Sequence, residues 1–215
     1  QSGLGNAAIL NLTEPISDVE AEALVYIGAP LSGSQYEVGD YFVLRGRPDP
    51  FHFYGDNPLA PNLPGGSGTS SNGDVGVRLR FENNVGGSGK VNLFVDQRID
   101  GQTTAFAGPI TINTPGWYRV ALSVKDDKVA AIIGGQFGNY EPNGTLSGGI
   151  RLPAQGFYTT TIDTPGGVGI NYHTKASPSS FTPICPLTYD HLTFRAPTLE
   201  SWAEPTAAED WQLFQ

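Results

Sequence analysis

Three carboxylates near the start of the chain alternate along one short stretch. Asp18, Glu20 and Glu22 stand two residues apart, so on a β-strand their side chains share one face. Alternate residues of a strand lie about 6.6 Å apart, close to the roughly 5–5.5 Å carboxyl separation of retaining glycosidases. These residues are therefore candidate catalytic groups, and the alternative is an exposed acidic strand face that carries no reaction.

A second set of candidates could hold a cation. Asp56, Asn57 and Asp74 flank a long stretch, residues 55–76, that is rich in Gly, Ser, Asn and Pro. Carboxylate and amide oxygens are the ligands that Ca²⁺ prefers, and solvated loop residues are the alternative. No metal-binding spacing links the three histidines, which are His52, His173 and His191. The sequence thus requires no cofactor and allows a Ca²⁺ site.

A third set consists of polar residues that alternate with apolar ones and could form a lattice across one sheet. They are Arg78, Arg80, Asn92, Asp96, Arg98, Arg119, His191 and Arg195. Pairs of opposite charge across strands stabilise a sheet by about 0.2–1 kcal/mol each and need no ligand. The alternative is a sugar-binding face, where these groups bind hydroxyls and an aromatic ring stacks on the sugar. Candidate rings are Phe51, Phe53, Tyr54, Tyr140 and Tyr158.

Strands must position these residues, because apolar and polar residues alternate throughout the chain. In the segment 75–82 the side chains of Val75, Val77, Leu79 and Phe81 point one way and the charged ones the other. The pair Asp126-Asp127 predicts a tight hairpin turn. The same reasoning predicts strands at 20–28, 41–47, 75–82, 91–98, 104–107, 110–113, 117–125, 128–134, 167–173 and 189–195.

Composition agrees with an all-β chain. The 215 residues include 28 Gly and 17 Pro, which suit turns and disfavour helices. About ten antiparallel strands with one apolar face each must pack as two sheets. We therefore expect one two-sheet antiparallel sandwich over residues 1–197. A C-terminal tail, residues 198–215, could form one short helical turn.

The tail carries the large aromatic residues Trp202, Trp211 and Phe214. Side chains of this size bury roughly 150–250 Å² each and seldom stay in water. The tail therefore either packs on its own domain or docks into a neighbouring chain, which would make it a self-association interface.

Net charge and hydropathy limit the partners of this chain, and other features of the sequence indicate its location. The net charge of −9 disfavours nucleic acid, whose binding requires a basic surface. No apolar run approaches the roughly 20 residues of a membrane span, so we expect no membrane insertion. Cys185 is the only cysteine, and the chain has no Met and begins at Gln1. The missing Met and the start at Gln1, with the sequons at Asn11 and Asn143, favour a secreted protein of the extracellular space or cell surface.

Three stretches carry a family resemblance. They are 18–28 (DVEAEALVYIG), 116–135 (GWYRVALSVKDDKVAAIIGG) and 189–195 (YDHLTFR). Together they resemble strands of the concanavalin A-like lectin/glucanase superfamily, in particular its laminin-G-like domains. The resemblance implies a jelly-roll sandwich and a lectin-like role. Glucanases of this superfold have the order Glu-x-Asp-x-Glu in mid-chain, whereas here the order is Asp-x-Glu-x-Glu near the start.

Three functions follow as expectations. The first is a carbohydrate-binding or glycan-facing sandwich without catalysis, whose partner is a glycan or polysaccharide. The second is a subunit of a self-assembling extracellular surface structure or filament. The third is a glycoside hydrolase that uses the acidic strand face. Neither a Gly-x-Ser-x-Gly elbow nor a phosphate-binding loop is present, which favours the two functions without catalysis.

Overall fold

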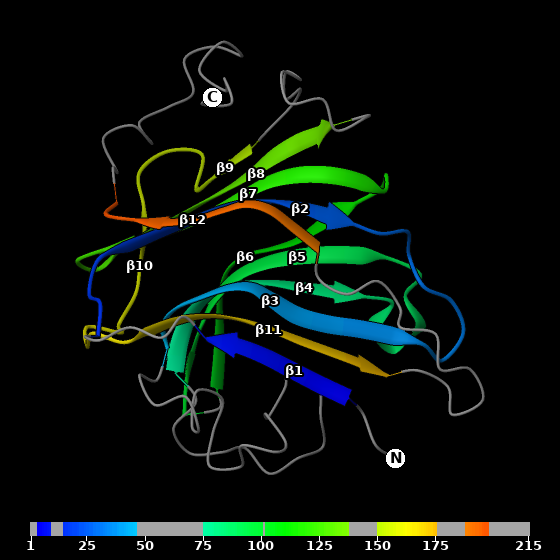
Figure 1. The fold of residues 1–215 in the computed structure, drawn as a ribbon, viewed down its shortest axis with the longest axis horizontal. Helices are drawn as coiled ribbons and strands as arrows, with labels where there is room; N and C mark the ends of the chain where they lie inside the picture. The colour runs from blue at the N-terminus through cyan, green and yellow to red at the C-terminus, as the bar shows by residue number, and fades with distance from the viewer. Residues whose placement is uncertain are drawn as a thin grey trace.

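The computed structural model describes residues 4–9, 15–46, 75–100, 102–137, 150–175 and 188–197. Within these ranges the chain forms twelve β-strands and one short 3-10 turn, η1 (Val85–Gly87). The strands make two facing antiparallel sheets (Figure 1). This architecture confirms the predicted all-β jelly-roll sandwich. No helix among the described residues is long and apolar enough to cross a membrane.

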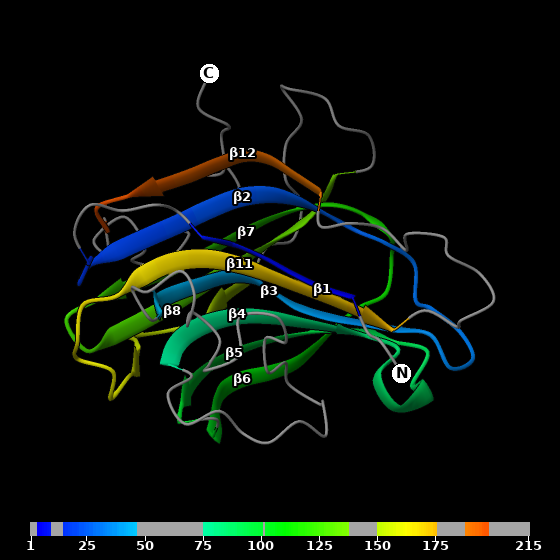
Figure 2. The same ribbon diagram turned by 60° about the horizontal axis from the view of Figure 1, so that its bottom comes forward.

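The first sheet, called sheet 1 below, has six strands in an order that differs from their order in the sequence (Figure 2). From one edge to the other they are β1 (Leu4–Ile9), β11 (Gly167–Lys175), β3 (Tyr36–Gly46), β4 (Val75–Asn83), β5 (Val91–Ile99) and β6 (Gln102–Ile112).

The second sheet, sheet 2, contains the other six strands. Its order is β10 (Tyr158–Thr159), β8 (Lys128–Phe137), β7 (Gly116–Lys125), β2 (Val19–Ile27) and β12 (Thr188–Arg195), and β9 (Ile150–Leu152) also pairs with β8. Lys125 and Lys128 face each other at the end of the β7–β8 hairpin, which confirms the predicted turn at Asp126-Asp127.

Alternation located nine of the twelve strands. The two strands expected at 104–107 and 110–113 are a single strand, β6, whose pairing with β5 is irregular between Ala105 and Ile110. The sequence reasoning missed β1, β9 and β10. The last two are three and two residues long, too short for alternation to show, and β1 is rich in Gly, Asn and Ala rather than in strand-forming residues.

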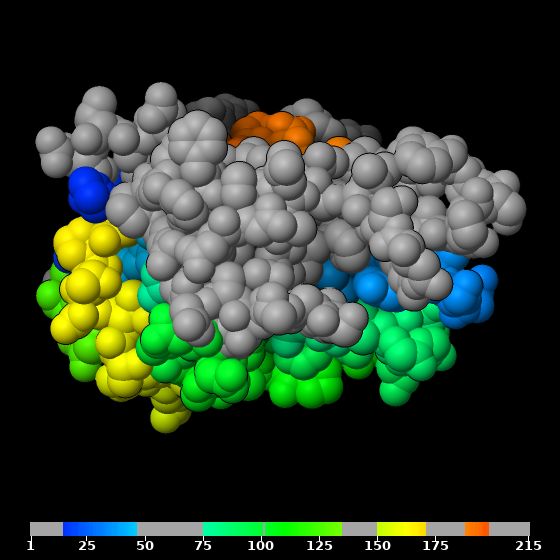
Figure 3. Space-filling view, turned by 90° about the horizontal axis from the view of Figure 1, so that it is seen from below, coloured from blue at the N-terminus to red at the C-terminus, as the bar shows by residue number. Residues whose placement is uncertain are grey.

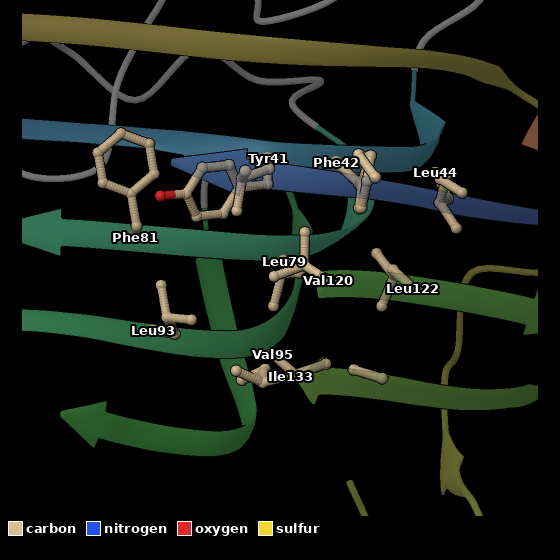
Figure 4. Close-up of a cluster of buried hydrophobic side chains, with 14 of the residues drawn as sticks. Tyr41, Phe42, Leu44, Leu79, Phe81, Leu93, Val95, Val120, Leu122 and Ile133 are labelled. Carbon is tan, nitrogen blue, oxygen red and sulfur yellow. The ribbon is translucent and has the colours of Figure 1, made fainter. Parts of the chain in front are cut away.

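The core fills the space between the sheets (Figure 4). Phe42, Leu79 and Leu93 enter it from sheet 1, and Val120 and Leu122 from sheet 2; all five are fully buried. Each such side chain contributes about 1.5–3 kcal/mol relative to an exposed one. Since neighbouring residues on a strand point to opposite faces, this packing sends the polar residues between them to the outer faces.

An irregularity in β3 changes this alternation at one point. The register with β4 shifts between Asp40 and Phe42, so Tyr41 and Phe42 both pack in the core. Asp40 remains paired with Arg80 on the outer face of sheet 1. A buried carboxylate is thereby added to the polar residues of β4 and β5.

Arg45 fixes one end of the sandwich. Its guanidinium donates to the carbonyl oxygens of Ser17 (2.5 Å), Ile162 (2.5 Å) and Asp126 (2.6 Å), and lies 3.3 Å from Asp18 Oδ1. The side chain is 2% exposed. One arginine thus joins the end of β3 to three segments that flank sheet 2.

Asn84 fixes the opposite end, in the β4–β5 connection. Its amide nitrogen donates to the carbonyl oxygens of Gly33 and Gln35, and its Oδ1 accepts from the Gly89 amide. Asn84 has a φ of 57°, a left-handed conformation that Asn adopts more readily than most residues. The connection that contains Gly86 and Gly87 is therefore a hairpin, and it also holds the β2–β3 loop.

Candidate functional site

The polar residues predicted to form one lattice lie on two opposite outer faces. Arg78, Arg80, Asn92, Asp96 and Arg98 belong to β4 and β5 of sheet 1, whereas Arg119, His191 and Arg195 belong to β7 and β12 of sheet 2. The single lattice is therefore a wrong prediction. Alternation shows that a residue points outward, but it does not show which sheet its strand joins.

On sheet 1, one carboxylate is shared by two arginines. Arg78 Nε donates to Asp96 Oδ1 at 2.7 Å, and Arg80 Nε donates to Asp96 Oδ2 at 2.9 Å. Arg78 Nη1 also lies 3.9 Å from Asp40 Oδ1. The side chains of Arg78, Asp96 and Asp40 are 1%, 0% and 0% exposed. These three groups form an internal framework, and Arg98 is buried as well, so a ligand at the surface would meet their neighbours instead.

Arg80 connects this framework to the surface. Its Nη1 donates to Glu82 Oε1, and its guanidinium carbon lies 4.2 Å from the centre of the Phe94 ring. A guanidinium over an aromatic face contributes about 0.5–2 kcal/mol, most where water is excluded. Three contacts thus fix the position of one cation above a half-buried phenyl ring.

Beside this ring, β5 and β6 present an amide and a hydroxyl. Thr111 Oγ1 donates to Asn92 Oδ1 at 2.8 Å; Thr111 is exposed and Asn92 half-buried. Among the described residues, neither Asn92 Nδ2 nor Glu82 Oε2 makes a hydrogen bond. We call the set Arg80, Glu82, Asn92, Phe94 and Thr111 the β4–β6 polar surface.

This surface offers directional hydrogen-bonding groups of both kinds next to an aromatic ring. Asn92 supplies two amide protons, Glu82 an acceptor oxygen, and Thr111 a hydroxyl. Sequence reasoning found Arg80 and Asn92 but missed Phe94 as a site residue. The signal was available, since Phe94 lies between Asn92 and Asp96 in the outward alternation of β5.

On sheet 2, the predicted acidic stripe is divided. Glu20 and Glu22 share the outer face of β2, but Asp18 precedes the strand and accepts hydrogen bonds from Arg45 and the Asp126 amide. Neither glutamate belongs to an exposed acidic face, because Glu20 is 0% exposed and Glu22 18%. The three carboxylates therefore do not share one strand face, as the catalytic interpretation required. Nor do Glu20 and Glu22 form the exposed acidic face of the alternative interpretation.

Two arginines neutralise the glutamates. Arg195 Nη2 lies 2.5 Å from Glu20 Oε1 and 2.6 Å from Glu22 Oε2, and Arg119 Nε donates to Glu22 Oε1 at 2.5 Å. Burial of the Glu22 carboxyl disfavours its charge, but the hydrogen bond and charge of Arg119, with those of Arg195, outweigh burial and lower the pKa. A general acid of a glycosidase needs a raised pKa, so this environment does not favour that role for Glu22.

His191 occupies an irregular position on β12. The pairing with β2 shifts between Asp190 and Thr193, and His191 has a φ of 52°. Its side chain is exposed, with Nδ1 3.1 Å from Asp190 Oδ1. Tyr189, two residues earlier on β12, points into the sandwich, where its hydroxyl donates to the Tyr41 carbonyl oxygen. Burial raises the pKa of Tyr189.

Several predicted residues lie outside the described residues. They are Asp56, Asn57, Asp74, His52, Phe51, Phe53, Tyr54, Tyr140, Cys185, Trp202, Trp211 and Phe214. The calcium site and the tail interface therefore stay predictions. Within the described ranges, no group of three or more His, Cys, Asp or Glu residues could hold a metal ion.

Comparison with known proteins gave structural matches only. No family model and no curated protein matches the chain, so the laminin-G resemblance stays an expectation from the sequence. A tailspike protein from an Escherichia coli bacteriophage matches 77% of this chain with 14% identity and a TM-score of 0.42, and the chain spans 18% of its length. A toad ovary galectin, solved with thio-digalactose, matches 91% of this chain and 100% of its own, with 11% identity and a TM-score of 0.40. A homodimeric agglutinin from chicken liver matches 89% and 100%, with 8% identity and a TM-score of 0.39.

Proposed function

We propose that this chain is a glycan-binding β-sandwich without catalysis, and that its ligand lies on the β4–β6 polar surface. The observation that carries the proposal is the position of Arg80, held by Asp96 and Glu82 over the Phe94 ring, beside an Asn92 amide whose protons make no hydrogen bond to the described residues. Groups fixed before binding lose little conformational freedom when the ligand arrives. Such a surface suits a ligand that presents hydroxyls in a fixed geometry.

The charges on this surface favour a neutral saccharide. Arg78 and Arg80 already face carboxylates, so they have little positive charge left to attract an anion. Glu82 Oε2, which accepts no hydrogen bond from the described residues, would repel a carboxylate or sulfate, and the whole chain carries a net charge of −9. A neutral sugar instead gains hydrogen bonds to Glu82 and Asn92 and an apolar contact with Phe94. The chain is proposed to bind such ligands outside the cell, on polysaccharides or glycoproteins.

A glycan array followed by calorimetry with the best neutral oligosaccharide tests the proposal. Asn92→Asp keeps the side-chain shape but removes both Nδ2 donors, so we expect binding to weaken about tenfold, the equivalent of 1.4 kcal/mol. Gln155→Glu makes the same change in net charge at an exposed loop residue and serves as the control. The proposal fails if no neutral glycan binds, or if both variants bind as tightly as the unmodified chain.

A further inference from the structure

Strand β6 forms one border of sheet 1. It pairs with β5 on one side and is the last strand in the order of the sheet. Figure 2 shows it at that border, and in the space-filling view it lies at the surface along the lower rim (Figure 3). Gln102, Thr103, Thr104 and Ala105 are all exposed. An edge strand directs half of its backbone N–H and C=O groups away from its own sheet.

No charged residue protects this edge. The eleven residues of β6 read QTTAFAGPITI, in a protein where 15% of residues are charged. The β12 edge of sheet 2 differs, because β12 carries the charged or titratable residues Asp190, His191 and Arg195 and has irregular pairing with β2. Proteins that avoid pairing through their edges use such charges and irregularities. The irregularities of β6 lie beyond Ala105, outside residues 102–105.

The first half of β6 pairs regularly with β5 and is anchored to sheet 2 by a ring contact. Gln102, Thr103, Thr104 and Ala105 pair in unbroken register with Ile99, Arg98, Gln97 and Asp96 of β5. The Phe106 ring stacks on Tyr158 of sheet 2, with centroids 5.5 Å apart and ring planes 9° apart. This contact ties the edge to the other sheet. The strand can therefore offer its outer backbone groups without first becoming ordered.

We propose that β6 pairs with β6 of a second copy of this chain, antiparallel, through residues 102–105. A strand without charges is compatible with its own copy, and a twofold axis brings the same residues together from both chains. Six strands from each copy then form one continuous sheet. This dimer does not depend on the proposed glycan binding.

The pairing has a consequence for ligand binding. Antiparallel pairing of two identical edges requires a twofold axis perpendicular to the sheet, so the outer faces of both copies lie on the same side. The two β4–β6 polar surfaces, which include Thr111 of β6 itself, would then be neighbours. If the proposed function holds, the dimer binds two sites of one polysaccharide or surface at once, with a gain in avidity.

Sedimentation velocity over a concentration series tests the dimer. We expect the unmodified chain to have twice its 22.8 kDa mass at concentrations of tens of micromolar. Thr104→Lys places a like charge on both edges and should give a monomer. Thr114→Lys adds the same charge at an exposed residue just beyond β6 and should remain a dimer. Equal melting temperatures would show that both variants fold.

A monomeric unmodified chain overturns the proposal, and so does a Thr104→Lys variant that dimerises as well as Thr114→Lys. Calorimetry with a monovalent oligosaccharide separates this question from the proposed function. Thr104→Lys should keep the monovalent affinity and lose at least tenfold in apparent affinity for a glycan-coated surface. A dimer that binds no glycan would refute the proposed function while leaving the β6 interface intact.

Discussion

Asp96 and Arg80 meet at 2.9 Å between Oδ2 and Nε, and this contact holds the guanidinium over the Phe94 ring. The other oxygen of Asp96 accepts from Arg78 at 2.7 Å. One fully buried carboxylate thus compensates two arginines and positions the one that reaches the β4–β6 polar surface.

Removing the charge of Asp96 should destabilise the fold strongly. In Asp96→Asn a neutral side chain faces two buried guanidiniums, and we expect the free energy of unfolding to fall by about 3–5 kcal/mol, the usual cost of breaking a buried pair. Urea denaturation measures this loss. Asp100→Asn, four residues along in the exposed β5–β6 turn, is the control. Equal losses in both variants would show that Asp96 does not hold the framework.

Glu22 should make stability depend on pH in the acid range. Its pKa is lower in the folded chain than the ordinary value of 4.5, so its contribution is fully present above about pH 4.5. That contribution disappears as the pH falls through the folded-state pKa. Glu22→Gln should therefore be less stable than the unmodified chain at pH 7, and the difference should shrink at pH 3. Urea denaturation across this range measures both curves.

A double-mutant cycle can isolate the contribution of the ion pair between Glu22 and Arg119. Combining Glu22→Gln with Arg119→Gln should give a coupling energy of about 0.5–3 kcal/mol at pH 7, because the two side chains are in direct contact. A coupling near zero would mean that the pair does not cause the pH dependence.

Arg45 should be hard to replace, even by lysine. A lysine keeps the charge but cannot reach Ser17, Ile162 and Asp126 at once, so one buried and two partly buried hydrogen bonds to carbonyl oxygens cannot all be kept. We expect Arg45→Lys to cost about 2–3 kcal/mol and to lower the melting temperature by roughly 5–10 °C. Arg195→Lys, at a side chain that is 44% exposed, should cost less. The reverse order in calorimetric melts would contradict the role given to Arg45.

The alternation of apolar and polar residues predicted the position of the long strands of this protein closely. The segment 75–82 became β4 because Val77, Leu79 and Phe81 needed a common buried face. The alternation did not reveal β9 and β10, because two or three residues are too few to show a period of two. The irregular pairing of β12 between Asp190 and Thr193 also cannot be read from residue types alone.

The sequence by itself determined the fold class, the outward direction of the charged residues and the hairpin turns, because each depends on neighbours within a few positions. Only the tertiary structure decided that Arg80 and Arg195 lie on opposite sheets, that Asp96 is buried between two arginines, and that Phe94 lies beneath a guanidinium. The physical reason is that burial and ion pairing depend on which strands become neighbours. In this sandwich the neighbours of a strand are often far away in the chain, as with β3 and β11 or β2 and β12.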